Sequence, residues 1–155
     1  MKKILFVIVM FMAVWSVQAQ QIESQNVPPL VIQSFNKLYP DVVHVKYELE
    51  DGNYEAKFKK DDSKLEAVFS ATGTLIQTEK SLGSVKDLPI KVLNTLKKDF
   101  AGYTYKDAEV LTTADGKVLY EVEAESASVA YELLYDSEGN LMKKTLSEEE
   151  SKKKK

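Results

Sequence analysis

The stretch "DGNYEAKF" at residues 51–58 returns as "DGKVLYEVEA" at residues 115–124. In both places an Asp-Gly pair is followed by Tyr-Glu and an apolar residue. Asp-Gly favours a tight hairpin turn, because the central residues of such a turn adopt positive φ. The alternation of Tyr54, Ala56 and Phe58 with polar residues is typical of a half-buried strand. The repeat indicates a duplicated ligand site or a duplicated structural unit, and the flanking sequence favours the second.

The similarity extends to a helix ahead of each hairpin. Asn26-Val27-Pro28 matches Asp87-Leu88-Pro89, so we expect Asn26 and Asp87 to be helix N-caps with proline in the first turn. Apolar residues then recur with helical spacing at a constant separation between the copies. They are Val31, Phe35 and Tyr39 in the first copy and Val92, Leu96 and Phe100 in the second.

After each helix the pattern changes to alternation and predicts four strands per copy. The core-facing positions of the first copy are Val43, Val45, Tyr47, Leu49, Tyr54, Ala56, Phe58, Leu65, Ala67, Phe69 and Leu75. Those of the second are Ala108, Val110, Val118, Tyr120, Val122, Ala124, Tyr131, Leu133, Tyr135 and Leu141. The second hairpin has two extra residues before its Tyr-Glu pair, and an even insertion keeps every side chain on its face.

The sequence therefore predicts an α+β fold of two tandem helix-plus-antiparallel-sheet units. Each unit is too small to be stable by itself. We expect the two to share one sheet or to pack edge to edge, with both helices on one face.

The first 19 residues are typical of a cleavable secretory signal peptide. Lys2 and Lys3 precede an apolar run from Ile4 to Trp15, and small or polar residues follow up to Ala19. This run is shorter than the roughly 20 residues of a membrane-spanning helix. We expect export to the periplasm or the exterior, without stable membrane insertion after cleavage.

Four regions follow from these patterns. They are a signal peptide (1–19), a first repeat (20–86), a second repeat (87–146) and a disordered charged tail (147–155).

Charge argues against nucleic acid as a partner. All 21 basic residues are lysine, and loss of Lys2 and Lys3 leaves 19 against 24 acidic residues, a net charge of about −5. Binding to a phosphate backbone relies on a basic surface, and the bidentate recognition of phosphate or guanine relies on arginine.

Patterns for catalysis and for metal or cofactor binding are missing from the sequence. The single histidine, His44, lies on the polar phase of a predicted strand, and there is no cysteine. No nucleophile elbow, glycine-rich nucleotide loop or EF-hand loop occurs. We expect no enzymatic activity, no cofactor and no bound metal.

The outer face of the predicted sheet is the remaining candidate site. In the second copy Leu119 and Leu134 interrupt the polar phase beside Glu121 and Glu132. Exposed apolar residues bordered by charge can mark a contact surface. The alternative is that both leucines are buried against the other unit or a helix. The predicted partner-binding residues are His44, Lys46, Leu119, Glu121, Glu132 and Leu134.

The tandem "V/L-P…F/L…Y/F" helix, the "D-G-x-Y-E-A-x-F" hairpin and the closing "F/Y-[SD]-x-x-G-x-L" turn resemble a known family. They are similar, over about residues 27–146, to the PepSY-like, β-lactamase-inhibitor-like secreted proteins of bacteria. The resemblance implies a BLIP-like continuous sheet, a periplasmic or extracellular location and no enzymatic activity. Inhibitory proteins of similar architecture grip an enzyme with a concave sheet and loops, but no inhibitory loop matches here.

The sequence favours a secreted, non-catalytic binding module, inhibitor-like in architecture, that engages a protein or peptide through its sheet face. The alternative is an envelope protein that binds a small molecule or an ion.

Overall fold

The computed structural model describes residues 20–147, so the predicted signal peptide and residues 148–155 of the predicted tail lie outside it. Ser147, which the sequence placed in the tail, is buried, and its N–H donates a hydrogen bond to the carbonyl of Ala130.

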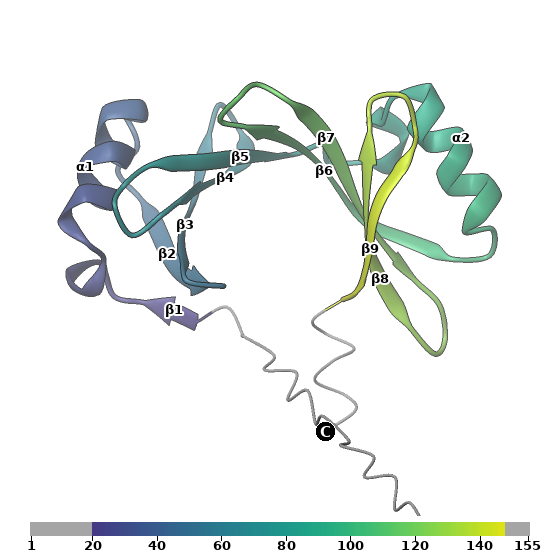
Figure 1. Cartoon of the computed structure of the whole chain (residues 1–155), viewed down its shortest axis with the longest axis horizontal. Coiled ribbons are helices and arrows are strands. Elements are labelled where there is room, and N and C mark those ends of the chain that lie inside the picture. The colour runs from purple at the N-terminus through teal and green to yellow at the C-terminus, as the bar shows by residue number, and fades with distance from the viewer. Residues whose placement is uncertain (1–19, 148–155) are drawn as a thin grey trace, which may run out of the picture.

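The described residues form nine strands and two α-helices (Figure 1). The strands are β1 (Gln20–Ile22), β2 (Val45–Glu50), β3 (Asn53–Lys60), β4 (Ser63–Phe69), β5 (Leu75–Ser81), β6 (Thr104–Thr113), β7 (Val118–Glu125), β8 (Ala130–Asp136) and β9 (Leu141–Leu146). Helix α1 (Pro29–Leu38) lies between β1 and β2, and helix α2 (Ile90–Asp99) lies between β5 and β6. Neither helix has the length and apolar character needed to cross a membrane.

All nine strands belong to one antiparallel sheet in which each strand pairs with the next along the chain. The first and second halves meet where β5 pairs with β6, in a register that runs from Gln77 opposite Thr113 to Ser81 opposite Glu109. The two halves thus share one sheet, which was one of the two expected arrangements. Because the sheet dominates the fold, the predicted α+β description of two units is supported only in part.

Both helices pack on the same face of this sheet. One register row joins Phe58 and Leu65, which belong to the core beneath α1, to Tyr120 and Tyr135 of the core beneath α2. Residues in one row share a face of the sheet. Figure 1 shows the sheet arching between the two halves with the helices on its outer side. We call the opposite face, which lies inside the arch, the inner face.

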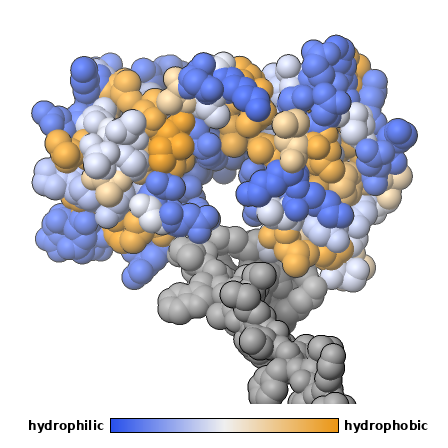
Figure 2. Space-filling model, in the orientation of Figure 1, coloured by the Kyte–Doolittle hydropathy of each residue, from blue (hydrophilic) through white to orange (hydrophobic). Residues whose placement is uncertain are grey.

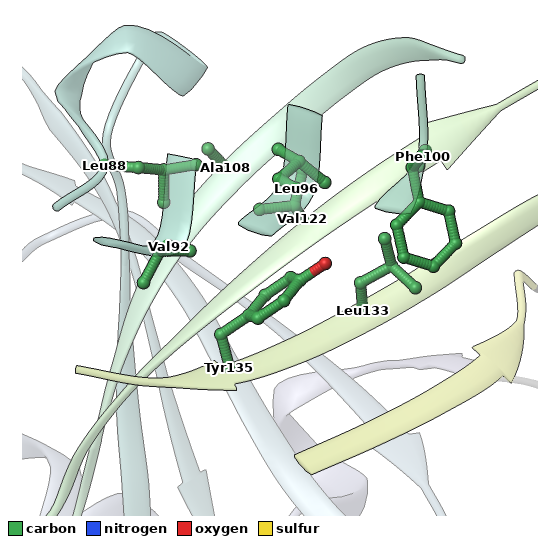
Figure 3. Close-up of a cluster of buried hydrophobic side chains, with 9 residues drawn as sticks. Leu88, Val92, Leu96, Phe100, Ala108, Val122, Leu133 and Tyr135 are labelled. Carbon is green, nitrogen blue, oxygen red and sulfur yellow. The ribbon is translucent and has the colours of Figure 1, made fainter. Parts of the chain in front are cut away.

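Each helix covers its own hydrophobic core. Beneath α1 the buried residues are Val27, Val31, Phe35, Tyr47, Ala56, Phe58, Ala67 and Phe69. Beneath α2 they are Leu88, Val92, Leu96, Phe100, Ala108, Val122, Ala124, Leu133 and Tyr135 (Figure 3). The helical stripe and the strand alternation read from the sequence supply both sets except Val27 and Leu88, which precede the helices. Val118 and Leu141, which were also predicted to face the core, are 39% and 40% exposed, so that part of the prediction was wrong.

The turn between the last two strands of each half touches the first turn of its helix. A Cβ built on Gly73 would lie 2.5 Å from the carbonyl oxygen of Leu30, and one built on Gly139 would lie 2.7 Å from that of Lys91. Both glycines also have positive φ, which side chains rarely adopt. The matched glycines of the two copies therefore allow each hairpin to approach its helix closely.

The helices begin later than the sequence predicted. Asn26 and Asp87 lie in 3₁₀ turns, η1 (Ser24–Asn26) and η2 (Val85–Asp87), and the N-caps are Pro28 and Pro89. The residue before a proline is disfavoured in the α region, so the backbone stays extended at that point and the helix starts after it. The prediction that Asn26 and Asp87 cap the helices was wrong.

Strand β2, which follows α1, also starts later than the sequence predicted. Pairing between β2 and β3 begins with Val45 opposite Phe58, and Val43 is 84% exposed. The prediction that Val43 faces the core was wrong. The Asp51-Gly52 turn, by contrast, has positive φ at both residues, as the sequence predicted.

Tyr135 occupies in the second core the position that Phe69 occupies in the first. Its side chain is fully buried, and among the described residues its hydroxyl has no hydrogen-bond partner (Figure 3). Burial raises the pKa of Tyr135 to about 12. An unpaired buried hydroxyl costs stability, because it loses its hydrogen bonds to water.

We expect Tyr135→Phe to raise the free energy of unfolding by about 1 kcal/mol, because it removes an unpaired polar group and keeps the ring. Urea denaturation measures the change. Tyr105→Phe is the matched control, since the Tyr105 hydroxyl donates to the carbonyls of Phe100 and Leu96 at 3.1 and 3.4 Å. That variant should be less stable than the wild type, and a loss of stability in Tyr135→Phe would contradict the interpretation.

Candidate functional site

Charged residues of like sign face each other across the strands of the inner face. Four glutamate pairs lie directly opposite in the register, namely Glu48–Glu55, Glu66–Glu79, Glu109–Glu121 and Glu123–Glu132. Two lysine pairs, Lys46–Lys57 and Lys59–Lys64, do the same at one end of the sheet. Like charges directly opposite on a sheet are destabilising. The inner face is therefore arranged at a cost to the stability of the fold.

Five of these glutamates form a continuous band across the sheet. The glutamate band consists of Glu66, Glu79, Glu109, Glu121 and Glu132, one from each of the consecutive strands β4 to β8. All five side chains are partly buried. At the usual spacing of neighbouring strands, five strands span about 19 Å. Hydrophilic residues border the gap between the two halves of the molecule (Figure 2).

One lysine neutralises the β4 end of the band. The ammonium of Lys57 lies 3.0 Å from a carboxylate oxygen of Glu48, 3.3 Å from one of Glu55 and 3.5 Å from one of Glu66. Burial lowers the pKa of Lys57, but the hydrogen bond with Glu48 and the charges of Glu66 and Glu55 outweigh it, so the pKa is raised. Lys57 therefore stays charged.

Four members of the glutamate band hold protons more tightly than ordinary carboxyl groups. Burial raises the pKa of Glu66, Glu79 and Glu121 to about 7, and repulsion from neighbouring glutamates adds to the effect. Burial also raises the pKa of Glu109. Near neutral pH the band is thus only partly ionised. A bound cation would favour the ionised form of these carboxyl groups.

A small depression lies at the β6–β8 end of the band. Its volume is about 180 Å³, and it is lined only by acidic residues: Asp107, Glu109, Glu121, Glu123 and Glu132. Within residues 20–147 no group of three or more histidine, cysteine or acidic side chains is placed to hold a metal ion.

The apolar residues of the inner face beside the band are buried or partly buried. Leu119 is 9% exposed and lies opposite Leu111, which is 6% exposed, while Leu134 is partly buried opposite Glu121. Leu119 is therefore buried rather than exposed, because it has an apolar partner on the adjacent strand, and its role in partner binding stays a prediction. Leu111 lies on β6 of the same half, so the burial of Leu119 is not caused by a helix or by the other unit, as the alternative expectation had it.

The six residues predicted from the sequence fall into two separate places. Leu119, Glu121, Glu132 and Leu134 lie together on β7 and β8. Lys46 lies on β2, and His44 precedes that strand. Five strand spacings, about 24 Å along a flat sheet, separate β2 from β7.

Three members of the band were not predicted as site residues. Glu66, Glu79 and Glu109 each occupy the polar phase of a strand. A signal was present in the sequence. Acidic residues on the polar phase of neighbouring strands lie on one face of the sheet, where they come close to each other.

The raised pKa values predict that stability falls as pH rises. A folded-state pKa above the unfolded value of about 4.5 means that the folded protein binds more protons in that window, so its extra stability is complete below pH 4.5 and is lost as pH rises through about 7. We expect the melting temperature to decrease between about pH 5 and pH 8, with a smaller decrease in Glu79→Gln/Glu121→Gln.

The pKa values of Asp115 and Asp136 are lowered by hydrogen bonds, chiefly from Thr113 and Asn140, so these two groups titrate below the window. Thermal denaturation followed by circular dichroism across the pH range makes the measurement. A melting temperature that increases toward pH 8 would contradict the raised values.

Comparisons with solved structures give the class of fold. A "putative periplasmic" protein of Bacteroides eggerthii matches with a TM-score of 0.70 and 13% identity, over 77% of this chain and 88% of that one. A DUF2874 family protein of Bacteroides ovatus matches with a TM-score of 0.68 and 22% identity, over 77% and 86%. A BLIP-like protein of Bacteroides fragilis matches with a TM-score of 0.62 and 22% identity, over 76% and 84%. The fold is therefore BLIP-like.

The sequence itself gives the family. The model described as "Putative beta-lactamase-inhibitor-like, PepSY-like" matches twice, at residues 11–77 and 53–143. Together these matches cover most of the chain, and the chain belongs to this PepSY-like family. Among curated proteins none matches the sequence significantly.

Proposed function

We propose that the chain is a secreted, non-catalytic binding module that engages a basic segment of a partner protein or peptide through the glutamate band. Its place of action is the periplasm or the exterior, which is supported by the residues typical of a signal peptide and by the periplasmic description of one structural relative. Membership of an inhibitor-like family supports a binding role rather than catalysis.

The observation that carries the proposal is the set of glutamate pairs that face each other across the inner face. Where no lysine bridges such a pair, as Lys57 bridges Glu48 and Glu55, the repulsion destabilises the free protein by a few tenths of a kcal/mol to about 1 kcal/mol. A partner that brings positive charge to the band relieves the repulsion between the glutamates. Part of this repulsion energy therefore contributes to the binding free energy. Complementary charge of this kind also speeds association and selects the partner.

The geometry favours a protruding or extended basic segment. By strand alternation the band lies on the face of β4 to β8 opposite the helices, and this face is the inside of the arch that the ribbon forms in Figure 1. Its carboxylates are partly buried, where the effective dielectric is lower than in water and charge pairs are stronger. A lysine- or arginine-rich loop can reach several of these carboxylates at once.

Fluorescence anisotropy with a labelled octalysine peptide tests the proposal. We expect salt-sensitive binding near pH 8, and about tenfold weaker binding to Glu79→Gln/Glu121→Gln. Glu138→Gln/Asp99→Asn is the matched control, because it removes the same charge from two exposed carboxylates near α2. Equal weakening in both variants would show that only net charge matters and would reject the band as the site.

The alternative, a small-molecule-binding envelope protein, is favoured by one feature. A groove of about 920 Å³ opens at the other end of the sheet and lies within the size range of small-molecule sites, about 300–1,000 Å³. An ion-binding version has no support among the described residues, which place no ligand set for a metal.

A further inference from the structure

The described part of the chain ends next to the glutamate band. Ser147 follows the last residue of β9, and its N–H donates a hydrogen bond to the carbonyl of Ala130 on β8. Two residues earlier, the hydroxyl of Thr145 donates to a carboxylate oxygen of Glu132, a member of the band, at 3.4 Å. Two residues of an antiparallel strand correspond to about 7 Å, so Ser147 lies roughly 10 Å from the nearest carboxylate of the band.

The sequence beyond Ser147 carries its charges in two blocks. Three glutamates (148–150) come first, and four lysines (152–155) follow after one serine; we call these four the lysine block. An extended chain spans at most about 3.6 Å per residue, so Lys152 can lie up to roughly 18 Å from Ser147 and Lys155 up to roughly 29 Å. The lysine block can therefore reach the band of its own chain.

The acidic depression of about 180 Å³ at the β6–β8 end of the band is the part that lies within this reach. Its lining comes from three adjacent strands, which span about 10 Å. Within residues 20–147 no ammonium nitrogen lies within 4 Å of a carboxylate oxygen of Asp107, Glu109, Glu121 or Glu132. Burial and neighbouring glutamates raise the pKa of Glu121, and the opposing charge of Lys143 on β9 does not offset them. These four carboxylates therefore lack the close cation that the β4 end of the band has.

We propose that the lysine block occupies the acidic depression of its own chain and competes there with the basic segment of the partner. This inference rests on the proposed function, because it assigns an internal occupant to the same site. Only four residues (148–151) join the block to Ser147, so its effective concentration at the depression is on the order of millimolar. Even a weak contact is then populated. The three glutamates (148–150) have the same charge as the depression, which leaves the lysines as the attracted block.

Fluorescence anisotropy with labelled octalysine, in the full chain at low salt and pH 8, tests the inference. The tail variant neutralises the lysine block: Lys152→Gln/Lys153→Gln/Lys154→Gln/Lys155→Gln. We expect it to bind octalysine at least about fivefold more tightly than the wild type, because the internal competitor is gone. The matched control makes the same change of net charge at four exposed lysines elsewhere: Lys37→Gln/Lys86→Gln/Lys97→Gln/Lys98→Gln. It should bind octalysine within about twofold of the wild type, because distant surface charges are screened.

The possible results separate this inference from the proposed function. Equal binding of octalysine to the wild type and the tail variant would overturn the internal contact and leave the glutamate band as a binding site. Equal gains in the tail variant and the control would also overturn it, since net charge alone would then explain the gain. Absence of octalysine binding to all three proteins would reject the band itself, and the internal contact with it.

A spin label distinguishes contact within one chain from contact between copies. The sequence has no cysteine, so Ser151→Cys gives a single attachment site beside the lysine block. We expect the label to broaden the backbone amide signals of Glu121, Glu123 and Glu132 in NMR spectra to the same extent at every protein concentration. Broadening that grows with protein concentration would assign the lysine block to the depression of a second copy and overturn the internal contact. Broadening absent from these three residues would overturn it as well.

Discussion

Replacing Gly139 with alanine is expected to lower the free energy of unfolding by about 3 kcal/mol, because two costs combine. The first is conformational, since Gly139 has φ +84° and a side chain there is strained. The second is steric, since the new Cβ would lie 2.7 Å from the carbonyl oxygen of Lys91 and the hairpin would have to move away from α2.

Gly116 separates these two costs. It has the same φ of +84°, but nothing lies within 4 Å of a Cβ built on it. Gly116→Ala should therefore lose only the conformational part, about 1 kcal/mol. Urea denaturation of both variants gives the difference. Equal losses would show that close approach of the hairpin to the helix is not what requires glycine at position 139.

Replacing Phe35 with alanine should have the other large effect, a loss of about 3–5 kcal/mol of unfolding free energy. The Phe35 side chain is fully buried, and its ring centroid lies 5.1 Å from that of Phe58, 5.4 Å from that of Tyr39 and 6.0 Å from that of Tyr47. Truncation leaves a cavity in the middle of the first core, and total stabilities of domains are only about 5–15 kcal/mol.

The control for Phe35 lies on the same helix. Leu38 is 46% exposed, so Leu38→Ala removes apolar surface without opening a cavity and should change stability by less than about 1 kcal/mol. Chemical denaturation makes both measurements. Comparable losses in the two variants would mean that α1 does not dock onto the sheet through Phe35.

The sequence predicted the elements of the fold because each is specified locally. The repeated Asp-Gly turns, the helical stripe that contains Phe35 and Leu96, and the alternation around Tyr54 all depend on neighbours along the chain. The joining of the halves was left open because it depends on the pairing of β5 with β6, two strands separated by α2. The helix starts were misplaced because Pro28 and Pro89 act on the residue before them, which outweighs the capping preference of Asn26 and Asp87.

The candidate site was predicted less completely than the fold. Glu121 and Glu132 were recognised because they stand beside leucines, whereas Glu79 and Glu109 stand in ordinary alternation. Their importance arises from the register, which puts Glu66 opposite Glu79 and Glu109 opposite Glu121, with the two pairs on the same face of the sheet. Register is a property of paired strands, so no single strand contains it. The choice between exposure and burial of Leu119 was left open for the same reason, since its burial depends on Leu111 across the ladder.

The central claim is that the glutamate band is the binding face for positive charge. Titration of isotope-labelled protein with octalysine, followed through the backbone amide signals in NMR spectra, tests it most directly. We expect chemical-shift changes concentrated at the glutamate band and its strand neighbours, with α1 and α2 unaffected. Changes concentrated on the helices, or scattered over exposed carboxylates such as Glu138, would contradict it.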